Sequence, residues 1–386
     1  MFKYRLLTPG PTPVPEDTLL ELARPVPHHR TAEARQILAD VVEGLRYVFQ
    51  TRGDVIPLTC SGTGAMEAAL IHAVPRGAKA LCLVAGKFGE RWHQIWRTYG
   101  VESVAITAPP GQVVTPAMVE TALRQHPDAQ AVCVVHCETS TGVKHDLKAL
   151  GELVAQTDAV LLVDAVSSAG AMELRMDDWH IDFLATGSQK ALMLPPGLAF
   201  VAVSDKGWRA AQRHQPPAFY FDLKKARDKI REHDTPFTPA HTLLRALRRS
   251  LEKIRTEGIE AVWWRHARLA HACRAAVQAL GLELFATVPA ESLTAVRVPA
   301  QLDGQEILRR LEKDYGIKLA GGQDQLKGKI LRIAHMGYID FFDLLAAIAA
   351  LELVLRDLGF DVPAGRGVAA AQRAFAEFHC SSGSSN

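Results

Sequence analysis

Six short apolar runs recur along the first half of the chain, and helical segments separate most of them. They are VIPLT at 55–59, ALCLVA at 80–85, AVCVVH at 131–136, VLLVDA at 160–165, FLATG at 183–187 and LAFVAV at 198–203. Several are apolar at successive positions, which is typical of strands buried on both faces. Because parallel strands need crossover connections, the pattern predicts an α/β fold with a mainly parallel sheet covered by helices.

The periodicity changes towards the C-terminus. A helical pattern fills residues 30–50, and a long helical stretch covers roughly 240–280. After it come segments typical of a smaller α+β domain, namely strands at 293–298 and 330–335 and helices near 304–314 and 340–358.

These patterns divide the chain into an arm at 1–30, a large domain at 31–260, a small domain at 261–361 and an extension at 362–386. The arm contains TPGPTPVP and PVPHHR, so we expect it to be extended and without helix, because proline disfavours helical backbone at and before its own position. We expect the extension to pack poorly, and it ends in the polar tail SSGSSN.

Length and composition are those of an ordinary two-domain folded protein and give no sign of a nucleic-acid-binding or membrane protein. A chain of 386 residues suits two domains, and 48% apolar with 22% charged residues is ordinary for a folded protein. The net charge of +2 gives no reason to expect nucleic acid or a membrane surface as partner. No apolar run approaches the roughly 20 residues of a membrane span, and the N-terminus lacks signal-peptide features. We therefore expect a cytoplasmic protein.

The six cysteines do not indicate a metal site. Cys133 and Cys137 are closely spaced, but they lie in a strand pattern and no second Cys/His pair has the spacing of a zinc site. We expect structural cysteines in a reducing compartment and no bound metal.

Two features could together hold a phosphorylated, nitrogen-containing ring. Ser61, Gly62 and Thr63 lie between a strand and a helix, where backbone N–H groups and the helix dipole favour an anion. A simple helix cap would explain them equally well. Asp164 ends an apolar strand, and a buried carboxylate there needs a partner such as a protonated ring nitrogen, a helix N-terminus or an internal cation.

Two cations lie in unusually apolar surroundings. Lys190 follows a strand and precedes apolar residues and a Pro-Pro-Gly turn. It is either a lysine that extends its amine to solvent or a partly desolvated Schiff-base lysine. Arg332 lies inside the strand ILRIAH, where it would bind a substrate carboxylate or form an internal ion pair.

The order of these features resembles a known family, the class V aminotransferases of the fold-type I pyridoxal-phosphate enzymes. Within it the chain most resembles the alanine–glyoxylate and serine–pyruvate aminotransferases. The resemblance covers nearly all of residues 5–360 and rests on TPGPTPVP, SGTGAMEAAL, GKFGERW, HCETSTGV, VDAVSS, TGSQKAL…PPG, FYFDLK, FTPAHTLLRAL and LRIAHMG. It implies a seven-stranded large-domain sheet, pyridoxal 5'-phosphate as cofactor and ping-pong transfer from alanine or serine to a 2-oxo acid such as glyoxylate or pyruvate.

The resemblance also implies catalytic and cofactor-binding roles. Lys190 would form the Schiff base and move the proton, while Asp164 would keep the pyridine nitrogen protonated. The remaining cofactor residues would be Ser61, Gly62, Thr63 and Gln189 at the phosphate, Phe88 on the ring face and Thr139 near the ring hydroxyl.

Further implied roles concern the substrate and a partner subunit. Arg332 would bind the substrate carboxylate, and Gly10 in the arm would line the substrate entrance. Thr238 would donate to the phosphate of the other subunit in a homodimer with shared active sites. Thr235 stands where the family often has tyrosine, so a second contact across the interface is in doubt. We interpret His28 and His29 as arm or interface residues.

The sequence argues against two rival functions and leaves others open. A cysteine desulfurase needs a reactive cysteine on a loop after the lysine, but Cys273 lies in a helix pattern and Cys380 in the tail. A nicotinamide dehydrogenase needs a glycine fingerprint that the sequence lacks. Other amino donors, namely aspartate, 2-aminoethylphosphonate or pyridoxamine, stay open. So does a non-catalytic interaction protein, such as a hydrogenase-associated subunit.

Overall fold

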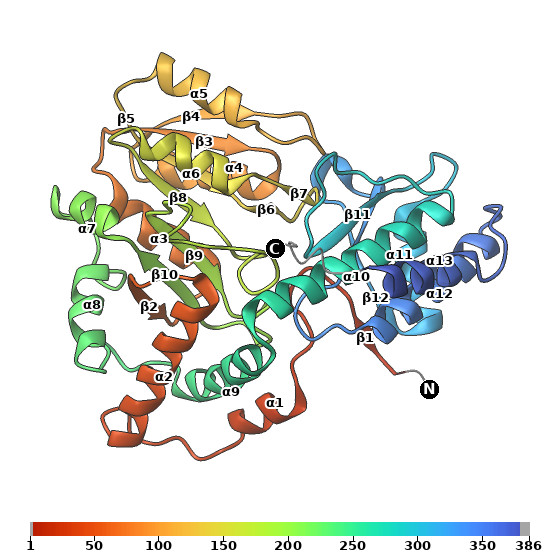
Figure 1. The fold of residues 1–386 in the computed structure, drawn as a ribbon, viewed down its shortest axis with the longest axis horizontal. Helices are drawn as coiled ribbons and strands as arrows, with labels where there is room; N and C mark the ends of the chain where they lie inside the picture. The colour runs from red at the N-terminus through yellow and green to blue at the C-terminus, as the bar shows by residue number, and fades with distance from the viewer. Residues whose placement is uncertain (1–2, 379–386) are drawn as a thin grey trace, which may run out of the picture.

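The six apolar runs form six strands of one seven-stranded sheet in the computed structural model, which describes residues 3–378 (Figure 1). These strands are β2 (Asp54–Leu58), β3 (Lys79–Val84), β5 (Ala129–Val135), β8 (Val160–Asp164), β9 (Phe183–Gly187) and β10 (Ala199–Val203). The sheet order is β2-β10-β9-β8-β5-β3-β4. Only β10 runs antiparallel to its neighbours, so the prediction of a mainly parallel sheet is confirmed.

The seventh strand, β4 (Glu102–Thr107), has no counterpart among the six runs. It pairs only with β3 at the edge of the sheet, and its residues are exposed or half-buried. An edge strand with little buried surface does not produce a continuous apolar run, which explains why the pattern missed it.

Helices cover both faces of the sheet, as expected. Alternate residues of β8 enter different cores: Leu161 and Val163 pack on one side and Val160 and Leu162 on the other. The helices of this lobe are α2 (Ala32–Phe49), α3 (Gly62–Ala73), α4 (Lys87–Thr98), α5 (Pro116–Gln125), α6 (Leu147–Ala155), α7 (Asp205–Gln212), α8 (Leu223–Arg231) and α9 (His241–Glu257). A short ribbon of β6 (Cys137–Glu138) and β7 (Val143–Lys144) leads towards the second lobe.

The second lobe has its own core around a three-stranded antiparallel sheet in the order β11-β14-β13. Its elements are α10 (Ile259–Ala279), β11 (Leu293–Arg297), α11 (Gly304–Tyr315), β12 (Ile317–Lys318), β13 (Ala320–Gly321), η1 (Asp324–Leu326), β14 (Ile330–Ala334), α12 (Phe341–Asp357) and α13 (Arg366–Glu377). None of the helices in the described range 3–378 is both long and apolar enough to cross a membrane.

The helical stretch at 240–280 is two helices and not one. Gly258 separates α9 from α10 with a φ of 88°, a conformation that favours glycine. The first residues of α10, including Val262 and Trp263, pack in the large core, whereas Leu269 and later residues pack in the second core. The predicted domain boundary at 260/261 therefore falls within the first turn of a helix that connects the two lobes.

The prediction that the arm has no helix was wrong. Residues Glu16–Leu22 form α1, which begins directly after Pro15 and carries Glu16 and Asp17 in its first turn. The prolines lie before and after this short segment and not within it, and acidic residues stabilise a helix N-terminus. Earlier in the arm, β1 (Arg5–Leu6) pairs parallel with β12, and Leu7 is buried in the second core.

The expected poor packing of the extension was also wrong over the part that the structure describes. Helix α13 runs along α10 and α12 (Figure 1), and Ala371 is fully buried. The ring of Phe375 stacks on Phe341 with centroids 3.8 Å apart. The polar tail and Cys380 lie outside the described residues.

Candidate active site

A cavity of about 270 Å³ lies at the carboxyl ends of β5, β8 and β9. Every residue that the sequence predicted to bind the cofactor lines it, except Thr238; these residues are Ser61, Gly62, Thr63, Phe88, Thr139, Asp164, Gln189 and Lys190. Ligands of open α/β sheets bind at this edge, because the loops after parallel strands converge there.

The loop of Ser61, Gly62 and Thr63 begins helix α3. Ser61 is the N-cap residue, yet its side chain makes no capping hydrogen bond, so the helix-cap interpretation does not account for its hydroxyl. A Cβ on Gly62 would lie 2.9 Å from a methyl group of Val166, so the close packing of this loop depends on glycine. Free N–H groups at a helix N-terminus attract anions.

Asp164 ends β8 with its carboxylate buried at the cavity. Its Oδ1 accepts one hydrogen bond, from the backbone N–H of Val166 at 2.9 Å. Burial raises the pKa of Asp164 to about 6, with a further contribution from the negative charge of Glu138, while the Val166 hydrogen bond and Lys190 oppose the rise. None of the ion pairs found within residues 3–378 involves this carboxylate, so the internal salt-bridge alternative is not supported.

Lys190 is 8% exposed, which excludes a lysine that extends its amine into solvent. Its Nζ donates a hydrogen bond to the carbonyl oxygen of Pro9 in the arm. Burial lowers the pKa of Lys190 to about 8, and the positive charges of Arg332 and Arg91 act in the same direction. A neutral, nucleophilic amine is therefore more accessible here than on a solvated lysine.

Gly10 touches the same lysine. Its φ is 112°, and a Cβ there would meet Nζ of Lys190 and lie 2.5 Å from its Cε. The arm thus brings a side-chain-free backbone against the amine.

Arg332 lies on β14, the central strand of the small sheet, and is 7% exposed. Its Nε donates to the carbonyl oxygen of Gly321 at 2.8 Å and its Nη1 to that of Thr139 at 2.9 Å. These acceptors are neutral, and no hydrogen bond to Nη2 is found among the described residues. The internal ion-pair alternative is therefore not supported.

Two further residues at the site were missed by the sequence reasoning. Arg91 on α4 lines the cavity, donates to the hydroxyl of Thr63 at 3.3 Å and lies 4.9 Å from the ring centroid of Phe88. Glu138 is fully buried and accepts hydrogen bonds from the backbone at the start of α4. Both lie within segments that carry the resemblance, GKFGERW and HCETSTGV, and that position was the one signal that the sequence offered.

Thr238 does not lie in this cavity and is exposed on a loop before α9. The hydroxyl of nearby Thr235 donates within the loop, to the carbonyl oxygen of Phe237 at 2.7 Å. The contact of Thr238 with a partner subunit stays a prediction.

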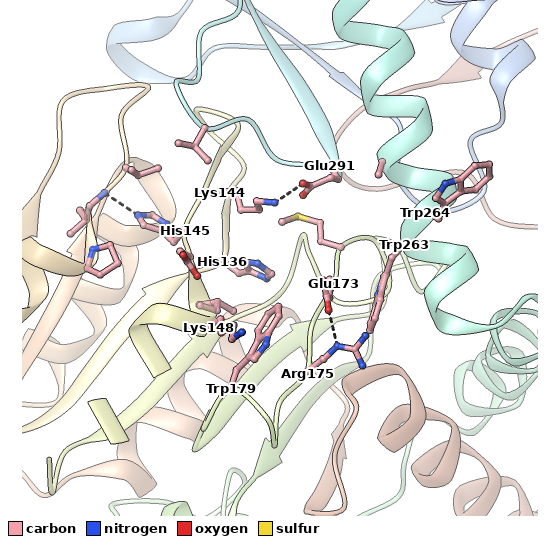
Figure 2. A pocket seen from close by; sticks show the side chains of 18 of the residues that line it. His136, Lys144, His145, Lys148, Glu173, Arg175, Trp179, Trp263, Trp264 and Glu291 are labelled. Carbon is pink, nitrogen blue, oxygen red and sulfur yellow. Dashed lines mark hydrogen bonds and ion pairs between the residues drawn. The ribbon is translucent and has the colours of Figure 1, made fainter. Parts of the chain in front are cut away.

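A larger cavity, of about 890 Å³, lies elsewhere, beside β7 and the start of α10 (Figure 2). None of the predicted site residues lines it. Several of its charged side chains pair with one another: Lys144 with Glu291, and Arg175 with Glu173 at 2.7 Å. The residues that the sequence predicted, among them Lys190, Asp164 and Thr63, lie together in the smaller cavity.

Comparison with known proteins shows the family of the chain. The family model for class V aminotransferases matches residues 21–336. A protein named soluble hydrogenase, small subunit, from Synechococcus sp. (strain PCC 6716) is 45% identical over 96% of this chain and 98% of its own length. The L-aspartate–glyoxylate aminotransferase of Paracoccus denitrificans is 36% identical, over 95% of both chains.

A solved structure is also similar to this chain in fold and sequence. The alanine–glyoxylate aminotransferase from Nostoc sp. has a TM-score of 0.88 and 32% identity, covering 92% of this chain and 96% of its own. Fold, cavity and relatives agree: the chain belongs to the class V aminotransferases, enzymes that transfer amino groups with pyridoxal phosphate.

Proposed function

We propose that the cavity at Lys190 binds pyridoxal phosphate and transfers the amino group of alanine or serine to glyoxylate or pyruvate by a ping-pong mechanism. The observation that carries the proposal is the guanidinium of Arg332, which is buried beside the cavity and, among residues 3–378, donates to two backbone carbonyls and forms no ion pair. Burial of a guanidinium is costly unless an anion completes it. An amino-acid or 2-oxo-acid carboxylate is such an anion.

The cavity residues fit the cofactor. The uncapped hydroxyl of Ser61 and the N-terminus of α3 suit a phosphate. The carboxamide of Gln189 lies in the same wall, and its N–H groups would be the donors to a phosphate there. Asp164 accepts a hydrogen bond from Val166 N–H, and the Trp92 side chain also lowers its pKa. A carboxylate has about four acceptor positions, which leaves capacity to pair with a protonated ring nitrogen. Phe88 would cover one ring face, and Thr139, whose hydroxyl lies 2.6 Å from that of Ser167, would face the ring hydroxyl.

The bound cofactor would supply an electron sink for the carbanion that forms when the substrate loses its α-proton. Lys190 would attach to the cofactor and then carry that proton, because its buried amine is neutral at a lower pH than usual. Asp164 would hold a proton on the ring nitrogen. Arg332, fixed by two backbone carbonyls, would orient the substrate carboxylate.

A small, uncharged donor side chain suits the surroundings. The backbone of Pro9 and Gly10 lies directly against Lys190 and limits the space there. A dicarboxylic donor would need a second cation, and Lys87, the residue before Phe88, is already paired with Asp324 at 2.7 Å. These contacts favour alanine or serine over aspartate.

Single-turnover mixing tests the donor. The loaded enzyme is mixed separately with alanine, serine, aspartate, 2-aminoethylphosphonate and pyridoxamine, and the visible cofactor band is followed. We expect alanine or serine alone to convert the band and glyoxylate or pyruvate to restore it, as ping-pong transfer requires. Faster conversion by aspartate or the other donors would refute the small-donor proposal while leaving aminotransfer intact.

The role of Arg332 as the clamp that binds the substrate carboxylate is tested by Arg332→Ala, with Arg332→Lys as the conservative variant. We expect the apparent dissociation constant for the amino donor to rise by roughly 10²-fold, since a charge-assisted bidentate contact is lost. Arg332→Lys should retain only part of the wild-type affinity for the donor, because a lysine cannot bind a carboxylate bidentately. Unchanged donor affinity in Arg332→Ala would show that the carboxylate binds elsewhere.

We also propose that the enzyme works as a homodimer. The support is a group of aromatic side chains on the loops near Thr238: Phe219 is 81% exposed, and Tyr220 stacks on Phe237 with centroids 5.2 Å apart. Tyr220 also reaches the carbonyl oxygen of Thr59, just before the phosphate loop. Exposed aromatic groups of this kind favour a protein interface.

A further inference from the structure

We propose that Glu138 is a positioning residue, which fixes the first turn of α4 so that Phe88 and Arg91 face the cofactor cavity. The proposal rests on the assignment of this cavity to pyridoxal phosphate. It concerns a side chain that touches neither the cavity nor the reacting groups, and that acts through the helix it holds.

The start of α4 lacks a cap of its own. The first N–H groups of a helix have no partner within the helix, and the N-cap residue is Gly86, which has no side chain to supply one. Instead, two residues about fifty positions later provide the acceptors. Ser140 Oγ accepts from Lys87 N–H at 3.0 Å, and Glu138 Oε2 accepts from Phe88 N–H at 3.1 Å and Gly89 N–H at 3.0 Å.

The other carboxylate oxygen is also satisfied. Glu138 Oε1 accepts from the backbone N–H of Ser140 at 3.1 Å and from its hydroxyl at 2.5 Å. Every partner of the carboxylate is a donor, which suits the ionised form. Burial raises the pKa of the Glu138 carboxyl, and the hydrogen bonds from Ser140, Gly89 and Phe88 oppose that rise. The positive end of the α4 dipole and the nearby guanidinium of Arg332 act in the same direction as these hydrogen bonds.

The local packing requires this arrangement. A Cβ on Gly86 would meet the hydroxyl of Ser140 and lie 2.7 Å from Cδ of Glu138. Gly86 therefore cannot cap the helix with a side chain, but its lack of a Cβ leaves space for the carboxylate of Glu138. Glu138 also precedes Thr139, which lines the cavity and holds Arg332 through its carbonyl oxygen.

The consequence for the site follows from the residues on the first turns of α4. Phe88 donates its own N–H to Glu138 and presents its ring to the cavity, and Arg91 lies one turn later over that ring. If the cap is lost, the first turn can fray, and both side chains lose their fixed orientation. The cofactor should then bind less tightly and in a less ordered environment.

The experiment compares Glu138→Gln with Glu352→Gln. Glu352 is a matched control, because it is also buried and also caps a helix N-terminus, accepting from Gly365 N–H and, at 3.0 Å, from Gly367 N–H before and within α13. It lies in the second lobe, away from the cavity. Cofactor-free wild type and both variants are titrated with pyridoxal phosphate, and the circular dichroism of the bound cofactor and the Tm of each apo-protein are recorded.

We expect Glu138→Gln to raise the cofactor dissociation constant at least tenfold and to weaken the cofactor dichroism, because the amide places donors against donors. Glu352→Gln should lower the Tm but leave the dissociation constant within about twofold. Equal cofactor affinity in wild type and Glu138→Gln, or an equal loss in both variants, would overturn the proposal. A wild type that binds no cofactor would instead overturn the proposed function.

Two more variants test the same proposal if Glu138→Gln folds poorly. Ser140→Ala removes one partner of the carboxylate and one acceptor of α4, so it should raise the dissociation constant by a smaller factor. In a Phe88→Ala background the effect of Ser140→Ala should shrink, because both act through the same contact. Fully additive effects would contradict positioning through Phe88.

Discussion

At the residue scale, Asp164 shows a conflict between stability and function. Its buried carboxylate is ionised at neutral pH although burial raises its pKa from 3.8 to about 6. An ionised group whose folded pKa is raised destabilises the fold above that pKa, and the cost disappears as the pH falls below the unfolded value. The residue is therefore costly to the apo-protein and is explained by a partner that arrives with the cofactor.

We therefore expect Asp164→Asn to stabilise the cofactor-free protein while it impairs catalysis. The gain in free energy of unfolding should be of the order of 2–3 kcal/mol above pH 6 and should vanish towards pH 4. Turnover should fall by roughly 10²-fold or more, since the ring nitrogen loses its anionic partner. Denaturant unfolding at several pH values checks the first part. A less stable variant at pH 7.5 would contradict the account.

Gly10 provides a second residue-scale prediction. Gly10→Ala should weaken cofactor attachment, because the new Cβ would collide with Lys190. Gly77→Ala is the control: it has a φ of 84° but no atom within 4 Å of the added Cβ, so it adds backbone strain without the collision. Titration with pyridoxal phosphate separates the two effects. If both variants bind the cofactor as wild type does, Gly10 has no role at the lysine.

The sequence made Lys190 and Asp164 predictable because each places a charge in or after an apolar strand. Glu138 was not predictable in the same way. Its partners Phe88 and Gly89 lie 50 and 49 positions away. No local pattern indicates that a helix with glycine at its N-cap is capped by a side chain from a distant segment. The carbonyl acceptors of Arg332 were also not predictable, because every residue has a backbone carbonyl and the side-chain pattern does not distinguish between them.

At the element scale, buried strands and short helices behaved differently. Strands β5, β8 and β10 were predictable because burial on both faces leaves a continuous apolar run. The break at Gly258 and the short helix α1 were missed, since a single glycine is compatible with a helix pattern and a seven-residue helix between prolines has no clear period.

Helix α13 leads to an element-scale prediction. Phe375 stacks on Phe341 and lies 3.7 Å beneath the guanidinium of Arg268. Phe375→Ala should lower the free energy of unfolding by about 2–3 kcal/mol, through lost packing and the lost cation–π contact. The exposed Arg373→Ala on the same helix should change it by less than about 0.5 kcal/mol. Equal stability of the two variants in denaturant would show that α13 is dispensable.

At the scale of the whole molecule, the proposed site is assembled from three parts of the chain. The arm supplies Gly10, the seven-stranded lobe supplies Lys190, and the second lobe supplies Arg332. The parallel pairing of β1 with β12 ties the arm to the second lobe. Movement between the lobes would therefore change the position of the clamp relative to the lysine.

A homodimer with shared sites makes a prediction for Thr238. Thr238→Ala should raise the cofactor dissociation constant several-fold, although Thr238 lies outside the cavity of its own chain. Thr235→Ala should not, because that hydroxyl bonds to Phe237 within its own loop. Light scattering with both variants gives the assembly state. A monomeric wild type with full cofactor affinity would contradict the shared site.

The central claim is that Lys190 is the lysine that carries the cofactor. The most direct measurement is reduction of the loaded protein with borohydride, digestion and mass spectrometry of the lysine-containing peptides, with Lys190→Ala treated in parallel. We predict a pyridoxyl phosphate adduct on Lys190 in the wild type and none in the variant. An adduct on a different lysine, or no adduct on a wild type saturated with pyridoxal phosphate, would contradict the account.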